Sequence, residues 1–237
     1  MAIAGCGSVS DSVRGYPLRA FVICLIAYTT AQMDLALFGY AVPAIRAEFG
    51  LTLSEVMAIV SAAFLFGGAL LVVLGWLADR VGRLPLFQFS LLGSSFLVAL
   101  ISIAPGVATL TALRGASIAV GGLSYPITGA IITEEMPARL RGLFMGLLQI
   151  GYPLGWALAS LWSMWLLTEY GWRQLFWVGL VSLPMVWVVR RYLREPPRSV
   201  AARSTEPPPR FSDLFATGVR ERAVTLFIAQ FLFVWAY

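Results

Sequence analysis

Long apolar runs alternate with short polar stretches over most of this chain. A bilayer core requires roughly 20 apolar residues in helical form, and six runs meet or nearly meet that length. They cover residues 20–43, 54–77, 85–104, 108–133, 142–167 and 171–192. The pattern therefore predicts an all-α membrane protein with six transmembrane helices.

A seventh apolar run follows Arg222 and reaches the last residue, Tyr237. As a helix it would cover only about 22 Å of the ~30 Å core. We therefore expect a truncated seventh helix at 222–237, and a chain that is a fragment. The proline runs with charges between residues 193 and 221 predict a cytoplasmic linker. Residues 1–192 form the expected bundle.

The amino-acid composition excludes several kinds of chemistry for this chain. Hydrophobic residues make up 59% of the chain and charged residues 12%, against about 25% charged in soluble domains. All 17 basic residues are arginine and there is no histidine, so any proton carrier must be Asp or Glu. Two cysteines form neither a disulfide framework nor a zinc site. No nucleophile–base pair, phosphate loop or metal cluster is visible, so we expect no enzyme, no metal and no cofactor.

The arginines predict the orientation. With the N-terminus in the cytoplasm, 14 of the 17 arginines face inward, whereas Arg46 and Arg173 face outward. Short cytoplasmic loops of membrane proteins carry the excess of basic residues. We therefore expect a multi-pass protein of the cell (inner or plasma) membrane. The net charge of +5 is explained by these loops and does not indicate nucleic-acid binding.

Asp34 lies within the first apolar run. An ionised carboxylate in hydrocarbon is costly, so an intramembrane Asp is a functional candidate by default. We interpret Asp34 as the proton-coupling group. The alternatives are that Asp34 forms a structural ion pair, or that the end of the span is misplaced.

Arg114 is the expected partner of Asp34. We place Arg114 roughly 8–9 Å and Asp34 roughly 13 Å below the outer surface. Arg114 either pairs with Asp34 or binds an anionic substrate through its planar fork of donors. The alternative is a side chain that extends to the outer surface.

Small and polar residues recur on the fourth and fifth helices. Ser117, Gly121, Ser124 and Thr128 follow Arg114 at helical spacing, which favours close helix packing, a polar cavity wall, or both. On the fifth helix, two glycine pairs have close-packing spacing. The candidate substrate-binding residues there are Gln149, Tyr152 and Trp156, with ordinary core packing as the alternative.

Four short motifs lie at the ends of the apolar runs. One is Gly75-Trp76-Leu77-Ala78-Asp79-Arg80-Val81-Gly82-Arg83, and the others are at 134–142, 171–176 and 195–198. All four resemble motifs of the major facilitator superfamily, and the first matches its pattern G-x-L-A-D-R-x-G-R-[KR] except for Leu84 at the end. Members have two six-helix halves, each built of 3+3 inverted repeats. The resemblance implies that this chain is an N-terminal half with the start of a seventh helix, and that its partner is a missing C-terminal six-helix half.

The resemblance also implies a cytoplasmic gate. A network of charges there would hold one face closed and open at low cost in the other state. The residues concerned are Gly75, Asp79, Arg80, Gly82, Arg83, Glu134, Glu135, Arg141 and Glu195. The alternative is that the arginines serve topology alone.

Within the superfamily, the chain resembles proton-linked organic-acid symporters of the sialate/carboxylate and aromatic-acid groups. These often carry D-x-x-D in the first helix, where this chain has Ala31 and Asp34. The resemblance implies proton-driven symport of a small organic anion through the lipid bilayer, with the proton gradient as the driving force. A truncated half that does not transport, and a carrier of a sugar or other neutral solute, remain alternatives.

Overall fold

A computed structural model describes residues 15–195, together with residues 221, 224–225 and 228–229. The described residues form six helical segments that are long and apolar enough to cross a membrane. This confirms the fold class predicted from the apolar runs. The linker and the seventh helix, predicted at 193–221 and 222–237, lie almost wholly outside the described residues and stay predictions.

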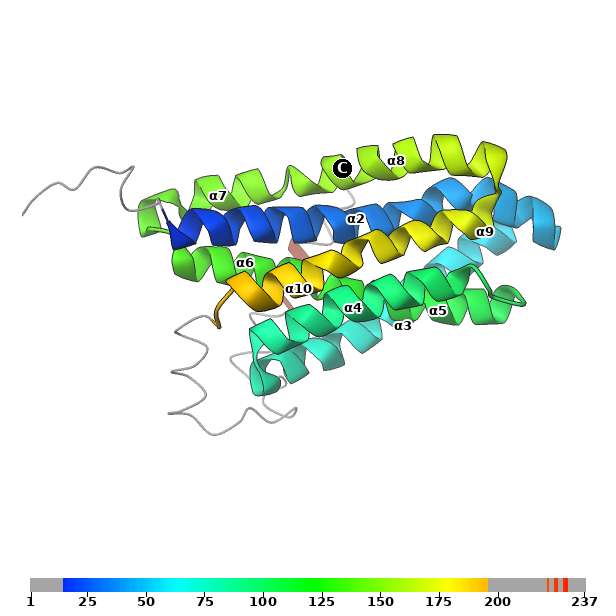
Figure 1. The fold of residues 1–237 in the computed structure, drawn as a ribbon. Coiled ribbons are helices and arrows are strands. Elements are labelled where there is room, and N and C mark those ends of the chain that lie inside the picture. The colour runs from blue at the N-terminus through cyan, green and yellow to red at the C-terminus, as the bar shows by residue number, and fades with distance from the viewer. Residues whose placement is uncertain (1–14, 196–220, 222–223, 226–227, 230–237) are drawn as a thin grey trace, which may run out of the picture.

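The first three segments are single helices and the last three are interrupted (Figure 1). The single helices are α2 (Tyr16–Phe49), α3 (Leu53–Val81) and α4 (Arg83–Ile101). The fourth segment is α5 (Val107–Gly122) with α6 (Ser124–Glu135). The fifth is η1 (Ala138–Leu140), α7 (Arg141–Leu148) and α8 (Gly151–Glu169). The sixth is α9 (Trp172–Leu175), η2 (Phe176–Ser182) and α10 (Leu183–Tyr192).

Helix α2 extends beyond the first apolar run. The run stops at residue 43, whereas α2 continues through Pro43 to Phe49. The helix ends at Gly50, whose left-handed backbone (φ 63°) lets its N–H bond to the carbonyl of Arg46. Charged residues in the last turn lower the hydropathy there, which is why the pattern alone ends too early. Asp34 therefore lies near the middle of α2.

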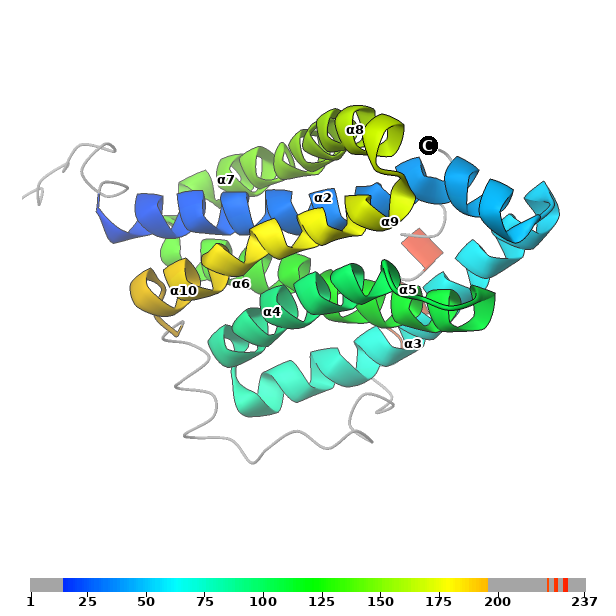
Figure 2. The same ribbon diagram turned by 45° about the vertical axis from the view of Figure 1, so that its right-hand side comes forward.

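Helix α2 occupies the centre of the described bundle. Figure 1 shows α7 and α8 along one side of it and α9 and α10 along another. In Figure 2, α3, α4 and α5 form a second group beside these helices. Contacts are most numerous between α3 and α5, between α2 and α8, and between α4 and α5. Residues of α2 can therefore face either group.

A glycine permits the close approach of α8 to α2. A Cβ at Gly155 would lie 2.6 Å from the Thr29 carbonyl oxygen and 2.8 Å from the Met33 nitrogen. Only glycine fits between the backbones at that distance. The other glycine pair of the fifth segment differs, because a Cβ at Gly142 or Gly146 would meet nothing within 4 Å. The spacing thus predicts packing correctly for one pair only.

Two apolar clusters fill opposite ends of the bundle. One includes Phe21, Phe87 and Ile131, at the end where α2 begins, and the other includes Leu37 and Phe176. Most of the buried polar side chains lie on the stretches of helix between the clusters or at their margins. They include Asp34, Ser90, Ser94, Ser95, Arg114, Ser117, Ser124 and Ser182. A buried polar layer of this kind marks the place where chemistry is expected.

An ion pair joins the loops at the end of the bundle opposite the start of α2. Arg173 pairs with Glu48 at 2.6 Å and also donates to the Ser102 carbonyl at 2.8 Å. The indole of Trp172 donates to the same Glu48 carboxylate at 2.6 Å. These bonds tie the end of α2 to α9 and to the loop that follows α4.

Candidate functional site

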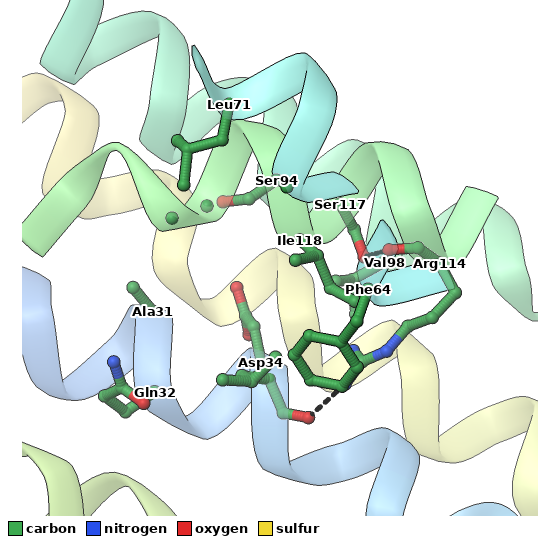
Figure 3. Close-up of a pocket in the computed structure, with 14 residues that line it drawn as sticks. Ala31, Gln32, Asp34, Phe64, Leu71, Ser94, Val98, Arg114, Ser117 and Ile118 are labelled. Carbon is green, nitrogen blue, oxygen red and sulfur yellow. Dashed lines mark hydrogen bonds between the residues drawn. The ribbon is translucent and has the colours of Figure 1, made fainter. Parts of the chain in front are cut away.

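A cavity of about 280 Å³ lies within the polar layer, between α2 and the group formed by α3, α4 and α5 (Figure 3). Apolar side chains and glycines form most of its wall. Its polar and charged lining residues are Gln32, Asp34, Ser94, Arg114 and Ser117. Both buried charges singled out from the sequence therefore border one space.

Asp34 presents a carboxylate with an unused acceptor to this cavity. The residue is only 3% exposed, and its Oδ2 accepts a hydrogen bond of 3.3 Å from the Ser182 hydroxyl. Its Oδ1 is buried and has no hydrogen-bond partner. A second buried acceptor without a partner, Oε1 of Gln32, borders the same cavity. Unpaired buried acceptors are costly, so the pair indicates a place for a proton or another donor.

Arg114 lies deep in the bundle and is turned away from an ion pair with Asp34. It is 5% exposed, so its side chain does not extend to the outer surface. Its Nη2 donates to the Leu35 carbonyl at 2.8 Å, and its Cζ lies 4.6 Å from the centre of the Phe38 ring. No nitrogen of Arg114 comes within 4.0 Å of an Asp34 oxygen among the described atoms. In this conformation the guanidinium is held by a carbonyl and a ring.

Ser182 is a site residue that the sequence reasoning missed. The sixth apolar run predicts one continuous helix, but the structure inserts the 3₁₀ stretch η2 before α10. Pro184 has no N–H to bond to the carbonyl four residues earlier, and Leu183 instead bonds to Leu180. The tighter turn ends at Ser182, which contacts Asp34. A single serine before a proline inside an apolar run was the available signal.

The small-residue stripe on the fourth segment performs both expected roles, at different depths. Ser117 and Gly121 border the cavity. One turn further, the Ser124 hydroxyl bonds to that of Ser90 at 3.0 Å and packs α6 against α4. The Thr128 hydroxyl donates to the carbonyl of Ser124 in its own helix. Cavity lining and close packing are thus successive parts of one stripe.

A second polar region lies where α2, α6 and α8 approach one another, and all of its side chains except Tyr28 are exposed. We call it the aromatic patch, and its members are Tyr28, Tyr125, Gln149, Tyr152 and Trp156. Gln149 links two of the rings, because Tyr28 donates to its Oε1 at 3.4 Å and its Nε2 donates to Tyr125 at 3.2 Å. The rings of Tyr152 and Trp156 lie 5.7 Å apart. The structure thus brings the three candidate residues of the fifth segment together, and adds Tyr28 and Tyr125.

Charged residues cluster at the end of the bundle where α2 begins. Arg83 forms an ion pair with Glu134, which links the start of α4 to the end of α6. The carboxylate of Glu195 accepts from the backbone N–H groups of Arg83 and Leu84, each at 2.9 Å. The first turn of a helix has unsatisfied N–H groups, and here a residue beyond α10 caps it. Three segments are thereby tied together.

The contacts described for the remaining expected gate residues lie within or near their own segments. Gly82 links α3 to α4 with φ at 118°, a backbone that favours glycine. Arg80 stacks over Trp76 at 4.4 Å, and Arg141 donates to the Met136 carbonyl. A Cβ at Gly75 would meet nothing within 4 Å, and Glu135 forms no ion pair with a described residue. The side chain of Asp79 lies outside the described part of the structure.

Comparisons with known proteins agree with this architecture. The family model described as Major Facilitator Superfamily matches residues 24–237. The chain is 31% identical over 181 residues to a cis,cis-muconate transport protein of Acinetobacter baylyi, covering 75% of this chain and 43% of that protein. It is 28% identical over 199 residues to a probable 4-methylmuconolactone transporter of Cupriavidus pinatubonensis, covering 80% and 45%.

Among solved structures, the proton:xylose symporter XylE superposes with a TM-score of 0.68 at 17% identity. The match covers 79% of this chain and 47% of that one, and at this identity it shows the fold alone. The chain spans somewhat less than half the length of the curated relatives that it matches. On the match of the family model, the chain belongs to the Major Facilitator Superfamily of membrane transporters, and its relatives are transporters and not enzymes.

Proposed function

We propose that this chain is the N-terminal half of a proton-coupled symporter for a small organic acid, which works by alternating access. The single observation that carries the proposal is the Asp34 carboxylate, buried beside Arg114 without an ion pair and with one unused acceptor. A carboxylate in that setting is stabilised by taking up a proton. Asp34 is therefore the proton-binding group of the proposed cycle.

Arg114 is the proposed site for the anion. Its guanidinium carries five N–H donors, and one hydrogen bond to a described residue uses Nη2. The remaining donors suit the two oxygens of a carboxylate. The named substrates of the two relatives, cis,cis-muconate and 4-methylmuconolactone, support an organic acid. A neutral solute would leave this buried charge without a counterpart.

The aromatic patch is the proposed contact for the body of the substrate. Gln149, Tyr152 and Trp156 offer one amide and two partly exposed rings. Flat apolar surface with a few polar groups is typical of small-molecule sites.

The proposed orientation places the start of α2 at the cytoplasmic face of the cell membrane. The excess of arginine at that end supports it. The cluster of Arg83, Glu134 and Glu195 is then the cytoplasmic gate, closed by one ion pair and by two hydrogen bonds to backbone N–H groups. Breaking them together would open that face.

Uptake by proteoliposomes tests the proposal. Vesicles hold either the protein that carries this chain or the 237-residue chain alone, and an inward proton gradient is imposed. We expect accumulation of labelled cis,cis-muconate or another small carboxylate only with the gradient, and only in the first set. Equal uptake with and without the gradient would contradict proton coupling. Labelled xylose serves as the neutral-solute control.

The alternative is a half that does not transport. It is favoured by one fact, the coverage of less than half of the matched relatives. It predicts no accumulation in either set of vesicles, with the chain still inserted in the membrane.

A further inference from the structure

A second hollow lies at the surface of the bundle, away from both regions described above. It has a volume of about 610 Å³ and runs between the first turns of α2 and the last turns of α10. These two ends lie side by side in Figure 1, and the Arg194 N–H donates to the Tyr16 hydroxyl at 2.8 Å. We call it the α2–α10 groove, lined by Tyr16, Leu18, Arg19, Val22, Ile23, Val188, Arg191, Tyr192 and Arg194.

The rim of this groove is basic. Arg19, Arg191 and Arg194 are all exposed, and none forms an ion pair with a described carboxylate. Two of them stack on aromatic rings, with Arg194 over Tyr16 at 5.5 Å and Arg191 over Tyr192 at 5.8 Å. The three guanidinium groups thus surround one mouth, and the described carboxylate that lies close enough to act on one of them is Glu135, which interacts with Arg194 at longer range than an ion pair.

The floor of the groove is apolar and points toward the middle of the membrane. Ile23 follows Tyr16 by about two turns of α2, or about 10 Å along the helix axis. On α10, Val188 lies one turn before Arg191, so it is further from the helix end than the arginine, as Ile23 is on α2. The groove therefore grades from basic at the helix ends to apolar inside the span. That gradient matches the headgroup and the first part of the chains of a phospholipid.

We propose that the α2–α10 groove binds an anionic phospholipid of the inner leaflet, with its phosphate between Arg19 and Arg191 and an acyl chain along Val22 and Val188. Basic pockets between transmembrane helices on the cytoplasmic side suit acidic headgroups. Tyrosines at the same level are typical of the membrane interface. A soluble phosphate would use the rim but gain nothing from the apolar floor, which is why the lipid is the favoured occupant.

Native mass spectrometry of the 237-residue chain in mild detergent tests this assignment. It measures the apparent affinity for phosphatidylglycerol and for phosphatidylcholine with the same acyl chains. We expect phosphatidylglycerol to bind at least about tenfold more tightly, since each arginine near an anionic lipid contributes roughly fivefold. The double variant Arg19→Gln/Arg191→Gln should weaken phosphatidylglycerol binding by about 30-fold and leave phosphatidylcholine unchanged.

A matched variant separates the groove from general surface charge. Arg139 and Arg190 are exposed at the same end of the bundle and do not line the groove. Arg139→Gln/Arg190→Gln removes the same charge and should keep the lipid preference. An equal loss in both double variants would overturn the proposal, as would equal binding of the two lipids.

A third variant tests the floor without altering charge. Val22 is 43% exposed, so Val22→Trp should fold, as a thermal melt can verify. It should weaken phosphatidylglycerol by about fourfold for each acyl CH₂ that loses contact. Displacement of the lipid by glycerol 3-phosphate at equal concentration would assign the site to a soluble phosphate and contradict the proposal.

Discussion

The cavity around Asp34 and the aromatic patch both border α2, and they differ in charge and in exposure. The cavity is lined by α2 to α5 and holds two charges that are not paired with each other. The patch is uncharged, exposed except for Tyr28, and linked by hydrogen bonds through Gln149. In the proposed function, these two regions have separate tasks, namely proton binding in the cavity and recognition of the substrate body at the patch.

The largest effect is expected from a larger side chain at the contact between α2 and α8, because both regions include residues of α2. Gly155→Ala places a methyl group 2.6 Å from the Thr29 carbonyl oxygen. Overpacking of this kind costs about 1–3 kcal/mol, so we expect the melting temperature in detergent to fall by roughly 2–12 °C. Gly146→Ala, where a Cβ meets nothing within 4 Å, is the matched control. Identical melting of both variants would show that the close contact carries no energy.

Removing the charge of Arg114 should affect the cavity alone. Hydrogen bonds to charged groups contribute about 1.5–3 kcal/mol, so Arg114→Gln should slow exchange of a labelled carboxylate by roughly 10- to 100-fold. Arg139→Gln removes an exposed arginine and should exchange at the unaltered rate. If Arg114→Gln exchanges normally as well, the anion meets another group.

Replacing one aromatic ring by an aliphatic side chain should affect the aromatic patch alone. Trp156 contributes a ring contact with Tyr152, and such contacts have a value of about 0.5–1.5 kcal/mol. Trp156→Leu should therefore raise the KM for an aromatic carboxylate roughly two- to tenfold and keep the dependence on the proton gradient. Trp165→Leu removes an exposed tryptophan elsewhere on α8 and should leave KM unchanged. If Trp156→Leu changed the dependence of uptake on the proton gradient, the cavity and the aromatic patch would not have separate roles.

The smallest effect is expected outside both regions. Glu195→Gln weakens the cap on α4, which is worth about 1 kcal/mol, and should lower the melting temperature by roughly 2–4 °C. Glu169→Gln alters an exposed carboxylate at the end of α8 and serves as the control. If Glu169→Gln lowered the melting temperature by as much as Glu195→Gln, the cap formed by Glu195 would not explain the loss of stability.

The sequence predicts the helices because hydropathy over about 20 residues is a strong signal. It also leads to Asp34 and Arg114, since a charge inside an apolar run is conspicuous. It does not show that Arg114 bonds to Leu35 and not to Asp34, because that depends on the relative rotation of α2 and α5.

Residues of ordinary type were missed for the same reason. Ser182 and Gln32 are unremarkable in sequence and acquire meaning from the carboxylate and cavity beside them. The cap by Glu195 joins positions more than 100 residues apart, a pairing that no local pattern reveals. Both glycine pairs of the fifth segment were predicted to pack. Gly151 and Gly155 do so, whereas a Cβ at Gly142 or Gly146 would meet nothing within 4 Å.

The most direct measurement of the central claim is the proton movement that accompanies substrate entry. A pH-sensitive dye inside proteoliposomes reports protons when a carboxylate is added outside without an imposed gradient. We predict internal acidification with the unaltered protein and none with Asp34→Asn, although Asp34→Asn still exchanges labelled carboxylate. Acidification of equal size in Asp34→Asn would show that another group carries the proton, and would contradict the account.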